Sequence, residues 1–208
     1  RGYYRFARLR TMCYLLRRAV GSIAYRTNGT NIAFRRSEFI AQEGYRGNLQ
    51  LVNGEYDFII NKFAEPGSAA ISLDPDSFLH QECRTKKTWT EFCIANSHVG
   101  SHLERKSRMR LTYAFDVLLM YLNYAALIAA GVYSGVTGRW LALAIAVVCI
   151  TFTLTLRIIL VKKKCRFFGE RISAWAIPFY ELSLVWFDML TKLRYMRADK
   201  HDFSTHKI

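Results

Sequence analysis

Apolar and polar positions divide the chain into two parts of different character. From Tyr113 to Val136 and from Trp140 to Val161 the sequence is almost continuously apolar, interrupted only by Asp116 and Arg157. Each run has the ~20 residues that an α-helix needs to cross a ~30 Å hydrocarbon core. The pattern predicts a transmembrane hairpin over 112–161.

Positive charge gives this hairpin an orientation. Basic residues are dense at its two open ends, 105–110 and 162–166, whereas the short connection carries one charge, Arg139. Basic flanks stay on the cytoplasmic side of a membrane. We therefore expect an integral membrane protein in which the polar segment 1–111 is cytoplasmic.

The third apolar stretch, Ile172–Leu193, has a different composition. It is rich in Trp and Tyr, includes Pro178, Glu181 and Asp188, and precedes a basic tail. A third crossing would move that tail to the opposite side against the charge rule. The sequence favours an interfacial or re-entrant amphipathic helix within 162–208 over a third span.

The first twenty residues interleave six arginines with apolar side chains at steps of three and four. This spacing predicts an amphipathic helix with a basic face. Such a face suits a membrane surface and suits solvent equally well, and both interpretations remain open.

Shorter patterns in the polar part predict strands and turns. Residues 31–34, 49–51 and 69–73 are typical of short strands, and 37–42 of a helical turn closed by Gly44. The acidic cluster Gly54-Glu55-Tyr56-Asp57 directly precedes an apolar run, where carboxylates commonly stabilise a helix N-terminus.

Charge and cysteine content limit the partners and the compartment. Thirty Lys and Arg against sixteen Asp and Glu give a net charge of +14, which favours anionic lipid headgroups or a nucleotide diphosphate as partners. No nucleic-acid-binding motif is present, so we expect no nucleic acid partner. The five cysteines form no Cys-x-x-Cys pair and indicate a reducing compartment, and His80, His98 and His102 lack companion ligands for zinc.

The order of several motifs in the polar part resembles a known enzyme family. The matching residues, in chain order, are Gly29-x-Asn31-x-Ala33-Phe34-Arg35, then Phe39, then Gly44-Tyr45, then Gly54-Glu55-Tyr56-Asp57-Phe58-x-x-Asn61. Over about residues 20–100 this order is similar to the second half of the catalytic domain of family 2 glycosyltransferases, and the membrane segments fit the same kind of protein.

The resemblance implies an α/β fold for 1–111, GT-A-like and present only as its C-terminal half. It implies an inverting transfer of sugar from a nucleotide-sugar donor to a lipid-linked or growing glycan acceptor. In the family a divalent cation, Mg²⁺ or Mn²⁺, is held by an Asp-x-Asp motif in the N-terminal half, which we expect to precede Arg1. Asp74-Pro75-Asp76 matches that motif by letter, but its position and its proline favour a turn, so no metal ligand is assigned here.

The resemblance also suggests roles for individual residues. One carboxylate of the acidic cluster would accept the proton of the acceptor hydroxyl as that hydroxyl attacks the sugar. Tyr56 departs from the family pattern, so Asp57 is the favoured base only if the base occupies the last acidic place, and Glu55 would orient the acceptor. Gly29 and Asn31 would line the sugar cleft, although an Asn that satisfies backbone groups in a turn is an equally good interpretation.

A Gln-x-x-Arg motif of the family has two candidate positions. Gln81-x-x-Arg84 has the right spacing but lacks the following Trp, and a register nearer the membrane falls on 95–98 with both key residues lost. Arg84 and His98 are candidates for binding the diphosphate, against a solvated basic loop. The alternative to an enzyme is a non-catalytic membrane protein that binds anionic lipid or a protein partner through its basic loops.

Overall fold

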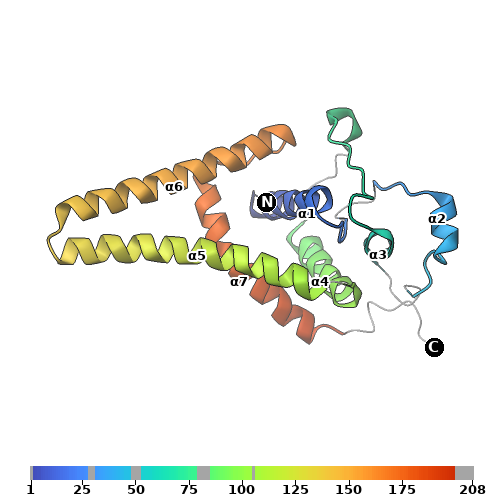
Figure 1. The fold of residues 1–208 in the computed structure, drawn as a ribbon. Helices are drawn as coiled ribbons and strands as arrows, with labels where there is room; N and C mark the ends of the chain where they lie inside the picture. The colour runs from blue at the N-terminus through green and yellow to red at the C-terminus, as the bar shows by residue number, and fades with distance from the viewer. Residues whose placement is uncertain (1, 28–30, 48–52, 79–84, 105, 200–208) are drawn as a thin grey trace. The chain divides into compact units, whose positions relative to one another are not determined.

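The computed structural model describes residues 2–27, 31–47, 53–78, 85–104 and 106–199. Within these residues the regular elements are all helical (Figure 1). In chain order they are α1 (Gly2–Gly21), α2 (Arg36–Ala41), α3 (Glu55–Phe63), the 3-10 turn η1 (Pro75–Ser77), α4 (Lys86–His102), α5 (Lys106–Val136), α6 (Trp140–Phe167) and α7 (Ala176–Arg197).

The prediction of an α/β, GT-A-like fold is wrong for the described residues, which contain no β-strand. Segments 31–35 and 69–74 have no regular secondary structure, and 49–51 lies outside the described residues. A strand is stable only when its N–H and C=O groups pair with another strand. Phe34 and Leu73 are exposed in these segments, so no buried sheet face forms either.

Contacts within the chain define two compact units. The first comprises residues 1, 3–106 and 186–208, and the second comprises residues 2 and 107–185. In the first unit, apolar side chains from three helices are buried: Phe6, Leu9 and Leu15 of α1, Ile59 of α3, and Val99 of α4. Aromatic pairs tie α1 to other helices of this unit, Tyr4 to Trp89 of α4 and Tyr3 to Phe187 of α7.

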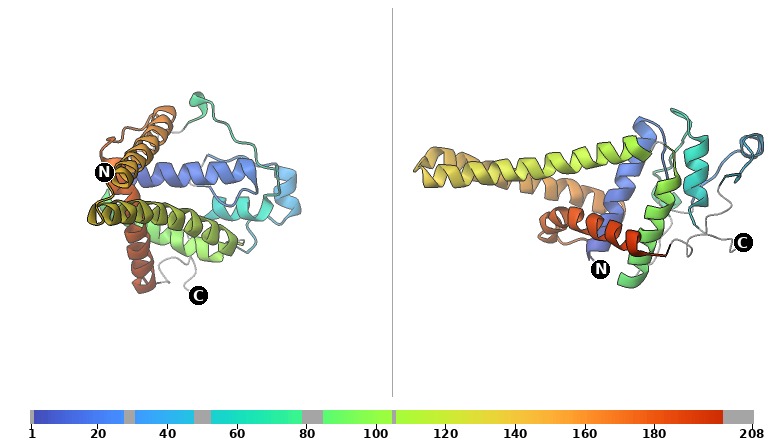
Figure 2. Two further views of the ribbon diagram at one scale, coloured as in Figure 1. Left: turned by 60° about the vertical axis from the view of Figure 1, so that its left-hand side comes forward. Right: turned by 90° about the horizontal axis from the view of Figure 1, so that it is seen from below.

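The second unit is built on the antiparallel pair α5 and α6, which lie side by side in each view (Figure 2). The buried positions of α5 recur with a helical period at Val117, Met120 and Ser134, and a Cβ at Gly131 would lie 3.9 Å from the Cβ of Ala146 on α6. This period keeps one face of α5 against its partner.

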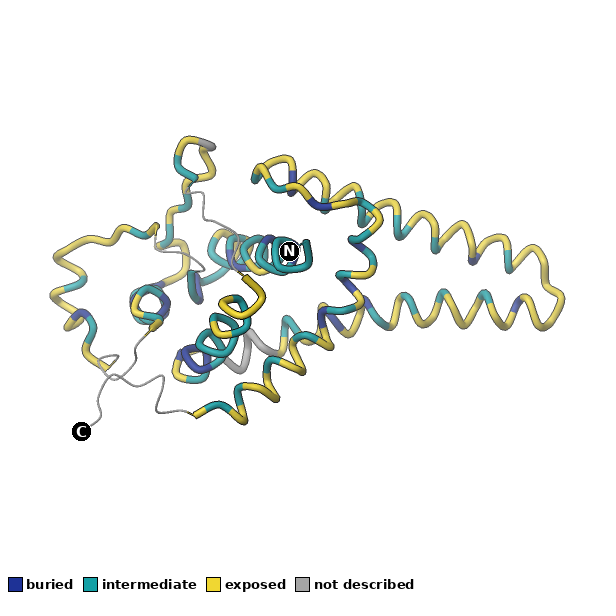
Figure 3. The backbone as a smooth tube through the Cα atoms, turned by 180° about the vertical axis from the view of Figure 1, so that it is seen from behind, coloured by how far each residue is buried: buried dark blue, intermediate teal, exposed yellow. Residues whose placement is uncertain are grey.

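The outward faces of α5 and α6 are apolar and exposed (Figure 3). The described residues include two helices long and apolar enough to cross a membrane, Leu111–Val136 and Trp140–Phe167. Both helical runs predicted from the sequence are confirmed, with α5 beginning earlier and α6 ending later than the apolar pattern alone indicated. Soluble monomers rarely expose so large an apolar surface, so its simplest environment is lipid.

Candidate functional site

The acidic cluster lies at the N-terminus of α3, where Gly54 makes a sharp entry into the helix. Gly54 has φ +94°, a left-handed conformation that residues with a side chain rarely adopt. A Cβ at this position would lie 2.5 Å from Cγ1 of Val99 on α4. Glycine therefore allows the start of α3 to approach α4 closely. Glu55 and Asp57 lie in the first turn of the helix that starts there.

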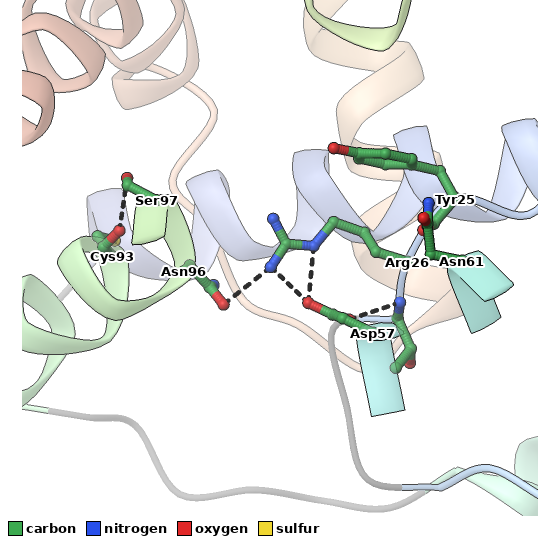
Figure 4. A network of polar contacts seen from close by, with 8 residues as sticks. Tyr25, Arg26, Asp57, Asn61, Cys93, Asn96 and Ser97 are labelled. Atoms are coloured by element: carbon green, nitrogen blue, oxygen red, sulfur yellow. Dashed lines mark hydrogen bonds and ion pairs between the residues drawn. The ribbon is translucent and has the colours of Figure 1, made fainter. Parts of the chain in front are cut away.

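Asp57 is the centre of a buried polar network (Figure 4). Its Oδ2 atom accepts hydrogen bonds from Nε and Nη2 of Arg26, at 2.9 and 2.5 Å, and its Oδ1 atom accepts one from the Thr27 amide at 2.9 Å. Nη2 of Arg26 also donates to Oδ1 of Asn96 on α4, at 3.0 Å. The carboxylate thus joins the segment after α1 to α3, and Arg26 extends the connection to α4.

Opposing effects act on the Asp57 carboxyl. Burial raises its pKa from the ordinary value, while the charge and hydrogen bonds of Arg26 and the Thr27 amide act in the opposite direction. The pKa remains raised on balance, with a smaller contribution in the same direction from the negative charge of Glu55.

Asn61, one helical turn further along α3, makes a second set of hydrogen bonds, to the backbone of Tyr25 and of Glu104. Its Nδ2 atom donates to the carbonyls of Tyr25 and Glu104, at 3.2 and 3.1 Å, and its Oδ1 atom accepts from the Glu104 amide at 2.8 Å. Asn61 is buried, and these bonds satisfy its amide. Residues 25–27 are therefore held along α3 at two points.

The other predicted site residues make different contacts. Glu55 is exposed at the start of α3, and Nδ2 of Asn31 donates to the carbonyl of Ser77 in the turn η1, at 3.1 Å. His98 leaves α4 about 200° round the helix from Asn96, and its Nδ1 atom lies 3.2 Å from the Tyr195 hydroxyl of α7. Gly29 and Arg84 lie outside the described residues.

Asp74 and Asp76 form a turn, as predicted. Oδ1 of Asp74 accepts from the Asp76 amide at 3.2 Å, and the Asp74 carbonyl accepts from the Ser77 hydroxyl at 2.7 Å. Across the described residues there is no group of three or more His, Cys, Asp or Glu side chains that could hold a metal ion.

Sequence reasoning missed Arg26 and Asn96. Arg26 is one of many arginines in a basic chain, and nothing in its local pattern separates it from the others. Its distinguishing property is a partner 31 positions away, and only the folded chain provides that partner.

Comparison with known protein families, with curated proteins and with solved structures finds no match for this chain.

Proposed function

We propose that this chain is the acceptor-side part of a membrane-anchored glycosyltransferase. The observation that supports the proposal is the bonding of residues 25–27 to Asp57 and Asn61. Residues 25–27 lead directly into the Gly29–Phe34 motif, and Asp57 and Asn61 belong to the second motif on which the family resemblance rests. The segment that precedes the first motif is thus bonded to residues of the second motif.

We assign different roles to the two carboxylates of α3, Asp57 and Glu55. Asp57 is buried and already accepts three hydrogen bonds from the protein, so we assign it to holding residues 25–27 against α3. Glu55 lies two residues earlier in the same helical turn and is exposed, so we propose that an acceptor reaches it there. We therefore assign proton acceptance to Glu55 in place of Asp57.

In the proposed step, the oxygen of an acceptor hydroxyl forms a bond to the anomeric carbon of the donor sugar. The bond from that carbon to the nucleotide diphosphate breaks, and the diphosphate leaves with the electron pair. The hydroxyl proton passes to the Glu55 carboxylate as the new bond forms, which is general base catalysis. We place this step on the cytoplasmic side, where nucleotide sugars are available.

The test uses the full-length protein in native membranes with labelled UDP-glucose, UDP-N-acetylglucosamine and GDP-mannose. Transfer of label into the lipid or glycan fraction is the expected result. Glu55→Gln should lower kcat at least 100-fold with an unchanged melting temperature, because a base contributes about 10²–10⁴-fold. Asp57→Asn should lower the melting temperature as well as the activity.

One observation favours a second candidate, the non-catalytic membrane protein. A buried carboxylate paired with arginine is a common structural device, and Asp57 requires no catalytic role to explain it. On this alternative, the full-length protein transfers none of the three sugars, and Glu55→Gln changes nothing. Binding to vesicles containing phosphatidylglycerol would then fall as salt rises, as expected for an electrostatic surface.

A further inference from the structure

We infer that α7 lies along the membrane interface on the side where both ends of the α5–α6 hairpin emerge, and that the ion pair between Arg157 and Glu181 holds it there. The proposed partner is the headgroup layer of a bilayer that contains anionic lipid. This inference concerns membrane attachment and does not depend on sugar transfer.

The first part of α7 is bonded to both membrane helices. Glu181 is buried, and its Oε2 atom accepts from Nη1 of Arg157 on α6 at 3.0 Å and from the Tyr124 hydroxyl on α5 at 3.4 Å. The guanidinium of Arg157 also lies 5.2 Å from the centre of the Tyr124 ring. The Tyr121 hydroxyl donates to the carbonyl of Leu182.

These contacts lie toward the open end of the hairpin. Arg157 is roughly 25 Å along α6 from Trp140, and Tyr121 is roughly 22 Å along α5 from Val136, at 1.5 Å per residue. In a hydrocarbon core ~30 Å thick that begins near the connection, both lie in the third nearest the open end. The segment between α6 and α7 also lies near this end of α6, because Nζ of Lys162 donates to the carbonyl of Ile172 at 2.6 Å.

One face of α7 is exposed and apolar. At about 100° per residue, its exposed apolar residues fall on one side of the helix. They are Phe179, Leu182, Val185, Trp186, Met189, Leu190, Leu193 and Met196. The buried residues Ile177, Glu181 and Leu184 lie on another face.

The composition of α7 suits an interface better than a span. It is not among the helices apolar enough to cross a membrane, and it ends in the basic residues Arg194 and Arg197. Tryptophan gathers at membrane surfaces. Trp140 is 73% exposed at the connection of the hairpin, and Trp175, 85% exposed, directly precedes α7. An apolar helix face suits burial just below the lipid headgroups, and the basic end of α7 complements anionic headgroups.

Cysteine labelling of the full chain tests the topology. In a background with all five cysteines replaced by serine, single substitutions Thr137→Cys, Lys163→Cys and Arg194→Cys are treated in sealed vesicles with a membrane-impermeant maleimide. Labelling of positions 163 and 194 from one side, with 137 from the other, is expected. Labelling of 194 together with 137 overturns the inference, because α7 then crosses the membrane.

Fluorescence quenching tests the depth of the apolar stripe. In a variant whose only tryptophan is Trp186, lipids brominated near the headgroup should quench more strongly than lipids brominated near the chain ends. A variant that retains only Trp89, whose ring contacts Tyr4 of α1, is the control and should be quenched less. Stronger quenching by the deep bromines, or quenching no greater than in the control, overturns the inference.

The role of the ion pair is tested in the Trp186-only protein. Glu181→Gln should reduce quenching by the shallow bromines at least twofold, and the double variant Arg157→Gln with Glu181→Gln should restore part of it by removing the unpaired charge. Asp116→Asn, an exposed carboxylate of α5, is the matched control. Unchanged quenching in Glu181→Gln overturns the assignment of the ion pair as the device that holds α7.

Discussion

The two compact units each contain a carboxylate buried against an arginine, and the two pairs differ in what surrounds them. Asp57 accepts from a guanidinium and from a backbone amide, so it fixes a loop to a helix. Glu181 accepts from a guanidinium and a phenol that project from two apolar helices. The comparison shows that one kind of ion pair can have two roles. In the polar unit it positions a loop, and in the apolar unit it attaches one helix to another.

Arg157→Ala should give the largest loss of stability. It leaves Glu181 buried among apolar helices without its cation, and breaking a buried pair from one side costs about 3–5 kcal/mol. The measurement is denaturant unfolding of the purified protein in detergent micelles. Lys163→Ala, exposed six residues further along α6, is the control and should change stability little. Equal losses in the two variants would show that the ion pair contributes nothing specific.

Asp57→Ala should have the next largest effect, about 2–3 kcal/mol, because Arg26 is partly exposed and water compensates part of its lost partner. Thermal unfolding followed by circular dichroism measures this. Glu55→Ala removes a carboxylate from the same helical turn without removing a buried bond, so it should leave the midpoint nearly unchanged. A larger effect for Glu55→Ala would reverse the assignment of the structural carboxylate.

Gly54→Ala tests how the start of α3 is positioned. The substitution introduces both a strained φ and a contact with Val99, and should cost about 2 kcal/mol. Gly67→Ala separates the two causes, because Gly67 also has a positive φ of +75° but has no atom within 4 Å of an added Cβ. We expect a loss of about 1 kcal/mol there. Equal losses would mean that contact with α4 does not determine the position of α3.

The smallest effect should be a pH dependence that comes from Asp57. An unfolded chain releases this proton near pH ~4, whereas the raised pKa makes the folded protein release it at higher pH. The folded state therefore loses stability as pH rises through this interval. The melting temperature of the wild type, relative to Asp57→Asn, should be higher at pH 4 than at pH 7. A difference that grows with pH would show that Arg26 outweighs burial.

The sequence predicted long helices well and short elements poorly. The apolar runs that became α5 and α6 are long enough for hydrogen bonding within the helix to satisfy every backbone group, so pattern alone decides them. The helical turn predicted at 37–42 is also confirmed as α2, and a helix over the first twenty residues is confirmed as α1. The strands at 31–34 and 69–73 failed because a strand depends on a partner, and no local pattern reveals whether one exists.

The same distinction applies to the candidate site. The glycine and carboxylates at 54–57 predicted the start of a helix, and α3 begins there. The sequence did not predict which of the two carboxylates is buried. Glu55 and Asp57 have similar local sequence, and they differ in the residues that they contact in the folded chain. Arg26, Asn96 and the pairing of Arg157 with Glu181 are likewise properties of distant neighbours.

The sequence by itself therefore determined the two long apolar helices, where the chain is apolar enough to enter a membrane, and how its positive charge is distributed. These properties follow from residues close together along the chain, through helical period and length. Tertiary structure alone decided which charges became partners and which carboxylate stayed exposed. Burial and ion pairing depend on side chains that approach from distant parts of the sequence, and only the packed helices bring them together.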